Sequence, residues 1–217
     1  MIKAAVIKQR KCKSCRNPYT PRNSMQPVCL TPTCIVDWHR KQEAKKVRAV
    51  GVAQRKARTE YRRETRRMRE AIMGRGEWVK KVQKDAFNPY IRERDRNERC
   101  ITCDRTNEEV AGTDGWKPGG LWDCGHYLSV GSHPNLRFIP DNAHKQCKSC
   151  NGGSKHYALK GRSVKESYDV NIVERIGQAA VDALKADNDP RKYTIEELKQ
   201  LYAHFTGLTR ALKKGEA

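Results

Sequence analysis

Cysteines are the residues of this chain whose spacing points most directly to chemistry. Eight of the nine fall into pairs, and two pairs together supply the four thiolates of a tetrahedral zinc shell. A shell with no open position is typical of a structural metal, so we expect two structural Zn²⁺ ions. The first group is Cys12, Cys15, Cys29 and Cys34, and the second is Cys100, Cys103, Cys147 and Cys150.

The second group is the stronger zinc candidate, because both of its pairs have the CxxC spacing. The first group ends in a wider CxxxxC pair, and an oxygen or nitrogen ligand such as His39 could replace a thiolate there. The alternative for either group is a set of buried free thiols. The N-terminus lacks the apolar stretch of a signal peptide, so we expect a reducing cytosol, where cysteines favour metals over disulfides.

Polar residues near the second group could hold a different metal. A hairpin held by zinc would bring Asp123 and His126 close to Asn151, which directly follows the last cysteine of the group. Carboxylate and amide oxygens are hard ligands suited to Mg²⁺ or Mn²⁺. A neighbouring histidine that binds no metal can act as a general base on water. The pattern therefore indicates metal-assisted hydrolysis of a phosphodiester.

The charge of the chain favours a nucleic acid partner. Lys and Arg total 45 against 25 Asp and Glu, a net charge of +20, which attracts a phosphate backbone. The alternatives are a protein kept soluble by its charge, or one that meets acidic membranes; no apolar run is long enough to span a bilayer. The candidate DNA-binding residues are a cluster of Arg62, Arg63, Arg66 and Arg67, and a set near the proposed metal site, Arg137, Lys145, Lys148 and Lys155.

Composition divides the chain into three parts. Residues 1–38 form a zinc module with too few apolar residues for a core of its own. Residues 39–76 form a basic helical arm whose apolar residues are too sparse for a wide hydrophobic face. This arm is a spacer, a phosphate-tracking element or a helix that pairs with a partner chain. Residues 77–217 hold the second cysteine group and C-terminal helices.

Finer patterns predict the elements of the third part. Residues 108–121 are rich in glycine and predict a loop, whereas 122–130 and 135–139 predict two strands. Residues 169–186 predict one amphipathic helix, and a further helix begins at the capping box of Thr194 and Glu197.

The order CxxC … D-x-G-H-Y … N-x-H-K-x-C-x-x-C-N resembles the phage lambda NinG (Rap) recombination endonuclease family. More widely, it is similar to the His-Me finger (HNH) nucleases of the endonuclease VII type. This resemblance implies that His126 is the general base, that Asn142 braces the hairpin loop and that Asn151 binds the catalytic metal. The family usually has an acid directly before the base, where this chain has Gly125, so Asp123 would have to reach the metal across a bulge or turn.

Together these patterns predict an α+β protein: a zinc-stabilised ββα-metal core with flanking helices, a small N-terminal zinc module and a long basic helix. The resemblance implies an endonuclease that cuts branched DNA such as Holliday junctions and D-loops in the host cytoplasm. We expect a homodimer, because junction resolution needs paired cuts, and recombination proteins are possible partners. The alternatives are a non-catalytic zinc-ribbon DNA-binding protein and an HNH endonuclease that cuts linear duplexes.

Overall fold

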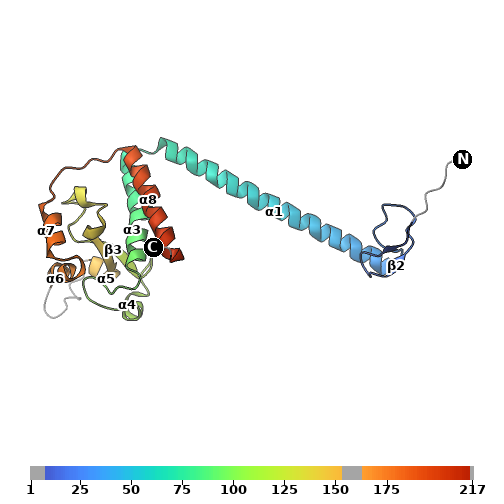
Figure 1. Ribbon diagram of the computed structural model, residues 1–217, viewed down its shortest axis with the longest axis horizontal. Coiled ribbons are helices and arrows are strands. Elements are labelled where there is room, and N and C mark those ends of the chain that lie inside the picture. Colours follow the sequence, from blue (N-terminus) through green and yellow to red (C-terminus); the bar gives the residue numbers. More distant parts are fainter. Residues whose placement is uncertain (1–7, 153–162, 216–217) are drawn as a thin grey trace. The chain divides into compact units, whose positions relative to one another are not determined.

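The computed structural model describes residues 8–152 and 163–215 (Figure 1). The chain divides into two compact units, residues 1–72 and 73–217. The described part is mostly helical, with two sheets of two strands each. None of its helices is long and apolar enough to cross a membrane.

The first unit is a small cysteine module followed by one long helix. Strands β1 (Arg10–Lys11) and β2 (Pro18–Tyr19) pair antiparallel, and α1 (Pro32–Ile72) then runs for 41 residues. Every residue of α1 is described, and Cys34 alone among them is buried. The helix begins inside the predicted module at 1–38, so the last cysteine of the first group lies on its first turn.

Helix α1 carries a narrow line of exposed apolar side chains, here called the α1 stripe. Its members Val47, Val50, Tyr61 and Met68 are 70%, 56%, 70% and 66% exposed. Val47, Tyr61 and Met68 occupy a positions of a heptad repeat and Val50 occupies a d position, so the four side chains share one face of the helix. The stripe is too narrow to anchor α1 to a large core, as the sequence indicated.

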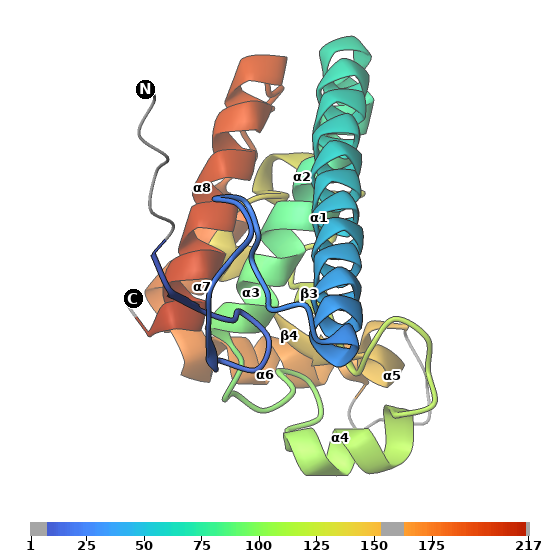
Figure 2. The same ribbon diagram turned by 90° about the vertical axis from the view of Figure 1, so that its right-hand side faces the viewer.

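The second unit begins with one continuous helical segment that changes its pitch. Helix α2 (Arg75–Val82) leads into a π-helical turn, η1 (Gln83–Phe87), and then into α3 (Asn88–Arg94). Pro89 has no N–H to donate to the preceding turn, which accounts for the wider turn just before it. Helix α8 (Ile195–Lys214) packs along this segment and lies beside α3 in both views (Figures 1 and 2).

Phe87, at the end of the π-helical turn, is the centre of the main core. Its ring centroid lies 5.0 Å from that of Phe205 on α8 and 5.8 Å from that of Phe138. The same core includes Cys124 from the sheet described next. The wide turn therefore places an aromatic ring between α8 and the sheet.

The sheet of the second unit positions the candidate site. Strand β3 (Trp122–His126) pairs antiparallel with β4 (Ala143–Cys147), from Trp122 opposite Cys147 to His126 opposite Ala143. Helix α5 (Lys148–Asn151) follows β4 directly. The first predicted strand is thus present in shorter form.

The second predicted strand, 135–139, is wrong. Its residues lie in and between two 3-10 turns, Pro134–Leu136 and Pro140–Asn142. A proline opens each turn, fixing φ and removing a backbone donor, so an extended strand between them is disfavoured. The true partner strand ends at the first cysteine of the last pair, and its sequence AHKQC has no alternation of apolar and polar residues that would predict a strand.

Two helix predictions also need correction. Helix α4 (Asn107–Asp114) occupies the first half of the predicted loop, and Thr106 caps it by accepting from the Glu109 N–H. The predicted helix at 169–186 is two helices, α6 (Val164–Ile176) and α7 (Gln178–Ala186). They break at Gly177, whose φ of +82° no regular helix contains.

The predicted capping box at the start of α8 is confirmed. Thr194 Oγ1 accepts from the Glu197 N–H at 3.2 Å, and Glu197 Oε2 accepts from the Thr194 N–H at 2.7 Å. The cap fixes where α8 starts, and thereby which apolar residues meet α2 and α3.

Candidate functional site

The first cysteine pair of each group sits in the same backbone turn. The carbonyl of Cys12 accepts from the Arg16 N–H at 2.9 Å, and that of Cys100 accepts from the Asp104 N–H at 3.0 Å. Arg16 and Asp104 both have a positive φ, 63° and 55°. Because the turn is repeated in detail, the first group is built like the second despite its wider second pair.

The four sulfur atoms of the first group fit a zinc ion. The ligand atoms all lie within 4.8 Å of one another, and the sulfurs of Cys15 and Cys29 are 3.9 Å apart. A tetrahedral shell with Zn–S bonds of about 2.3 Å places sulfurs about 3.8 Å apart. The backbone N–H of Cys29 also donates to the sulfur of Cys12 at 3.3 Å. Four thiolates complete the shell, so no position remains for His39.

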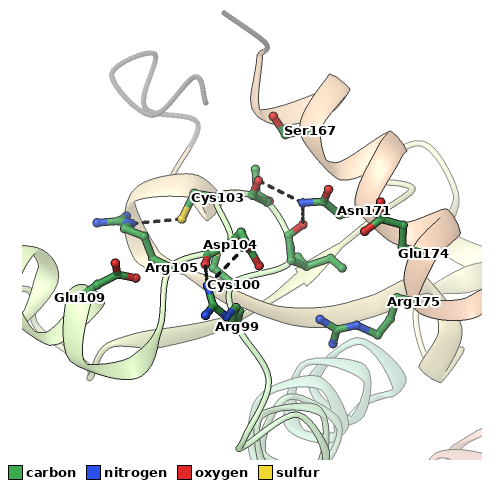
Figure 3. Close-up of a pocket in the computed structure, with 12 residues that line it drawn as sticks. Arg99, Cys100, Cys103, Asp104, Arg105, Glu109, Ser167, Asn171, Glu174 and Arg175 are labelled. Atoms are coloured by element: carbon green, nitrogen blue, oxygen red, sulfur yellow. Dashed lines mark hydrogen bonds and ion pairs between the residues drawn. The ribbon is translucent and has the colours of Figure 1, made fainter. Parts of the chain in front are cut away.

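The second group has the same geometry and an added positive charge. Its ligand atoms lie within 4.8 Å of one another, with 3.8 Å between the sulfurs of Cys103 and Cys147. Arg105 donates from Nε to the sulfur of Cys103 at 3.1 Å (Figure 3). Its Nη2 donates to the sulfur of Cys147 at 3.2 Å. Four thiolates around Zn²⁺ carry a net charge of about −2, which this guanidinium partly offsets. Both groups are consistent with structural Zn²⁺.

A surface hollow beside this second group is not the predicted hydrolytic site. It lies between the cysteine turn and α6 (Figure 3). Its arginines are matched by an equal number of acids, and it contains none of the predicted catalytic residues. The charged residues that line it are Arg99, Arg105 and Arg175, with Asp104, Glu109 and Glu174.

Asp123 and Asn151 lie next to each other, at the junction of β3 and α5. Asp123 Oδ2 accepts from Asn151 Nδ2 at 3.1 Å, and Asp123 Oδ1 pairs with Lys148 Nζ at 3.0 Å. The Asp123 side chain is 28% exposed, so this carboxylate faces solvent while it is held by α5. The structure therefore brings together the two oxygen ligands that the sequence predicted, with an ammonium beside them.

His126 is held in one orientation by its surroundings. Its ring stacks on Phe87, with 5.8 Å between centroids and 25° between planes, and Nε2 lies 3.1 Å from the backbone oxygen of Arg137. A carbonyl oxygen only accepts, so Nε2 carries the proton and Nδ1 keeps the lone pair. Burial, together with the charge of Arg137, lowers the pKa of His126 below its ordinary value of 6.5. The ring is therefore neutral at neutral pH.

The structure does not bring His126 to the Asp123–Asn151 pair. Side chains alternate along β3, so Asp123 and Gly125 face one side and Cys124 and His126 face the other. The contacts agree, because His126 packs with Cys124 against the core around Phe87. Asp123 and His126 are separated by about 10 Å along the strand. The predicted site is thus divided between the two faces of the hairpin.

Gly125 does not form the bulge that the sequence suggested. The pairing runs through it without interruption, from Asp123 opposite Gln146 to Gly125 opposite His144. A Cβ at position 125 would lie 2.0 Å from Gln146 Oε1 and 2.9 Å from Gln146 Cβ. Glycine is needed here because the Gln146 side chain crosses over it to reach Thr102 Oγ1 at 2.6 Å.

Asn142 is fully buried and holds the long connection between β3 and β4. Its Oδ1 accepts from the Leu128 N–H at 2.9 Å, and its Nδ2 donates to the backbone oxygens of Leu128 and Leu136 at 3.0 and 3.2 Å. None of these side-chain hydrogen bonds of Asn142 reaches His126. The carbonyl that orients His126 belongs to Arg137, one residue beyond Leu136, so Asn142 helps to fix the loop that carries it.

One predicted DNA contact is incompatible with its position. Lys145 is 2% exposed. Its ammonium donates to the Arg96 carbonyl at 3.0 Å and to Asn107 Oδ1 at 3.1 Å. The same ammonium lies 4.2 Å from the ring centre of Trp122. A satisfied, buried ammonium cannot reach a phosphate. Sequence alone missed this, because a lysine among charged residues gave no sign of burial.

The other predicted cations differ in accessibility. Arg62, Arg63, Arg66 and Arg67 are all exposed on α1. Arg137 is partly buried beside His126, and Lys148 is 18% exposed in its pair with Asp123. Lys155 lies outside the described residues.

Asp114 is a residue of the site that sequence reasoning missed. It is fully buried, and it accepts from Ser149 Oγ at 2.6 Å and from the Ser149 N–H at 3.1 Å. Ser149 lies on α5, two residues before Asn151, so Asp114 anchors the helix that carries Asn151. A buried carboxylate at a helix N-terminus is favourable, but its segment was predicted to be a loop, so no signal pointed to it.

Comparisons with known proteins decide the family. The profile described as "Bacteriophage Lambda NinG protein" matches residues 4–216. This chain belongs to the NinG family. NinG membership confirms the family part of the resemblance, whereas the His-Me finger assignment stays a prediction.

Several NinG relatives are similar over long stretches. Protein ninG of Escherichia phage 933W is 31% identical over 212 residues, covering 96% of each chain. Protein ninG of Escherichia phage lambda is 35% identical over 147 residues, 68% of this chain and 63% of the relative. That of Salmonella phage P22 is 38% identical over 135 residues, 62% of this chain and 57% of the relative. No solved structure matches significantly.

Proposed function

We propose that this NinG protein is an endonuclease that hydrolyses DNA at branched recombination intermediates such as Holliday junctions and D-loops. The single observation that carries the catalytic part is the orientation of His126. Its Nε2–H is committed to the Arg137 carbonyl, so Nδ1 is a neutral acceptor held in place by Phe87. This is the state that a general base requires before it takes a proton from water.

The pair of Asp123 and Asn151 is the proposed Mg²⁺ or Mn²⁺ site of a His-Me finger core. The donor set fits a hard cation, because one carboxylate and one amide oxygen lie on adjacent side chains. Lys148 pairs with the same carboxylate, so a bound divalent ion would take the place of its ammonium. A bound divalent ion would offset the charge that develops on the leaving oxygen. The strand–strand–helix order of β3, β4 and α5 supports this assignment.

The proposal requires the DNA strand to reach both faces of the hairpin. Its sheet has two strands, so the outer edge of β3 pairs with no other described strand. A phosphodiester that passes round this edge can meet Nδ1 of His126 and the oxygens of Asp123. Arg137, partly buried beside His126, is placed to hold a phosphate there.

Two further features support a DNA substrate and a dimer. The exposed arginines of α1 can contact phosphates on the arms of a branched molecule. Paired cuts need two active sites, and the α1 stripe offers an apolar surface for a second copy. Recombination proteins are possible partners, and the two zinc ions have structural roles.

The first test is cleavage of a labelled four-way junction beside a linear duplex of the same sequence, with and without Mg²⁺. We expect Mg²⁺-dependent cutting of the junction, and a rate lowered by roughly 100- to 10,000-fold in His126→Ala. His133→Ala is the matched control, because His133 contacts Ser132 and lies outside the site. Zinc content should equal that of the wild type in both variants.

A second candidate function is favoured by the division of the site between two faces. A non-catalytic zinc-ribbon protein would bind the junction through its cations and have no use for His126. Tight junction binding with no cutting in Mg²⁺ or Mn²⁺ would support this reading and contradict the endonuclease. Equal cutting of the linear duplex would instead indicate a duplex endonuclease.

A further inference from the structure

Trp116 is an exposed aromatic side chain that the proposed reaction does not use. It is 79% exposed, whereas Trp78 is 4% exposed and the other two tryptophans, Trp38 and Trp122, are partly buried. Among the described residues, no aromatic ring packs against Trp116. The indole therefore leaves most of its apolar surface in contact with water and available to a ligand.

The indole is held in place although its faces are open. Its Nε1–H donates to the Thr113 carbonyl at 3.1 Å, at the end of α4. Lys117 Nζ lies 5.7 Å from the ring centre, a weak cation–π contact. The polar edge of the ring is therefore satisfied by the protein, and a fixed flat surface remains for a ligand. Such preorganisation lowers the entropy cost of binding.

The loop of Trp116 is tied to the candidate metal site at two points. Lys117 Nζ hydrogen-bonds Ser149 on α5 and pairs with Asp114 at 3.2 Å. A Cβ at Gly119 would lie 3.5 Å from Lys148 Nζ, the ammonium that pairs with Asp123. The ring thus extends from a loop that borders both α5 and the Asp123 carboxylate.

We propose that Trp116 is a stacking platform for an unstacked DNA base beside the cleavage site. Every nucleobase has a flat π face that stacks on indole without sequence preference. In a continuous duplex those faces are covered by neighbouring base pairs, whereas at a branch point or in a single strand they are exposed. The ammonium groups of Lys117 and Lys148 are paired with Asp114 and Asp123, so they hold the loop of Trp116 in place and the ring itself supplies the contact with the base. Trp116 therefore supplies preference for branched over linear DNA.

This inference rests on the proposed DNA substrate but not on cleavage, so the test measures binding without divalent ions. The probes are a four-way junction with 2-aminopurine beside the branch point and a linear duplex with the same label. We expect Trp116→Ala to weaken junction binding by roughly 5- to 150-fold and to abolish quenching of the labelled base. Duplex affinity should change by less than about 2-fold. Trp116→Phe keeps a ring and should keep most of the quenching.

Other results would overturn the proposal. Unchanged junction affinity in Trp116→Ala, equal losses on junction and duplex, or a wild type without junction preference each contradict it. A change of oligomeric mass with normal DNA binding would assign the ring to a protein interface instead. If the wild type binds junctions through Trp116 but never cuts them, the endonuclease proposal is contradicted and the stacking role of Trp116 is retained. Fold is checked by zinc content and circular dichroism, and the exposure of the ring makes its removal structurally mild.

Discussion

His144 is a buried titratable residue whose charge state affects stability. It is 2% exposed, and burial, followed by the charge of Arg94, lowers its pKa from 6.5 to about 4. The folded state therefore disfavours the protonated ring, and the unfolded state binds the proton more tightly. The contribution of the neutral His144 ring to the free energy of unfolding is complete above pH 6.5. It is lost as pH falls towards 4, by up to about 3 kcal/mol.

Urea unfolding between pH 7 and 4 checks this prediction. As pH is lowered from 7 to 4, the free energy of unfolding should decrease less steeply in His144→Gln than in the wild type. The variant should have the lower stability at pH 7. Loss of zinc in acid affects both proteins, so the difference between their slopes isolates His144. Parallel slopes would show that the imidazole is not protonated on unfolding.

At the residue scale, residue types and spacing predicted that Asp123 and Asn151 lie together, but they did not predict which face of the strand each side chain occupies. Asp123 and Asn151 meet, because the last cysteine pair fixes α5 against β3. The separation of His126 from them follows from strand alternation across an uninterrupted register, which a bulge at Gly125 would have altered. That register depends on Gln146 filling the space above the glycine, a long-range contact that no local pattern encodes.

At the scale of elements, the two cysteine groups should act independently. Cys12→Ser and Cys100→Ser should each lose about one zinc per chain, since each breaks one four-thiolate shell. Cys100→Ser should also unfold the region around β4, because the Cys147 N–H donates to the Cys100 sulfur at 3.3 Å. Cys12→Ser should leave that region intact.

Zinc analysis with thermal melts followed by near-ultraviolet circular dichroism distinguishes the two variants. Tyrosine and tryptophan signals of the second unit should survive in Cys12→Ser and be lost in Cys100→Ser. Loss of both zinc ions from either variant would contradict independent sites.

Helices and strands were predicted correctly where the sequence signal lies within one turn of the chain. The capping box at α8 is a contact within one turn, and it was found. Helix α4 has the same kind of cap at Thr106, but its segment was predicted as a loop from its glycines alone. Strand β4 could not be found from periodicity, because all five of its residues are buried and so no alternation of exposure exists.

At the scale of the whole molecule, we expect a homodimer that pairs through the α1 stripe. Tyr61→Lys should weaken association at least about 30-fold, because each copy loses a buried aromatic ring. Pairing brings two cationic helices together, so dimerisation should strengthen as salt screens their repulsion. Light scattering over a range of concentration and salt measures both effects.

Thr59→Lys is the matched control for this prediction. Thr59 is exposed on α1 away from the stripe, and the substitution adds the same charge. Equal weakening by both variants would show that charge, and not the stripe, governs association. A wild type of monomer mass at every concentration would exclude the dimer.

The two cysteine groups begin with the same backbone turn, but the segments of chain that they enclose differ greatly in length. The first group encloses residues 12–34 and the second encloses residues 100–150. The first group is complete once residue 34 has been made, whereas the second needs residue 150. Closing the shorter loop has the smaller entropy cost, and domains fold in the order in which they leave the ribosome. The N-terminal module can therefore bind a Zn²⁺ ion while β3 and β4 are still being synthesised, whereas the core around Phe87 and His126 can form only after α8 has been made.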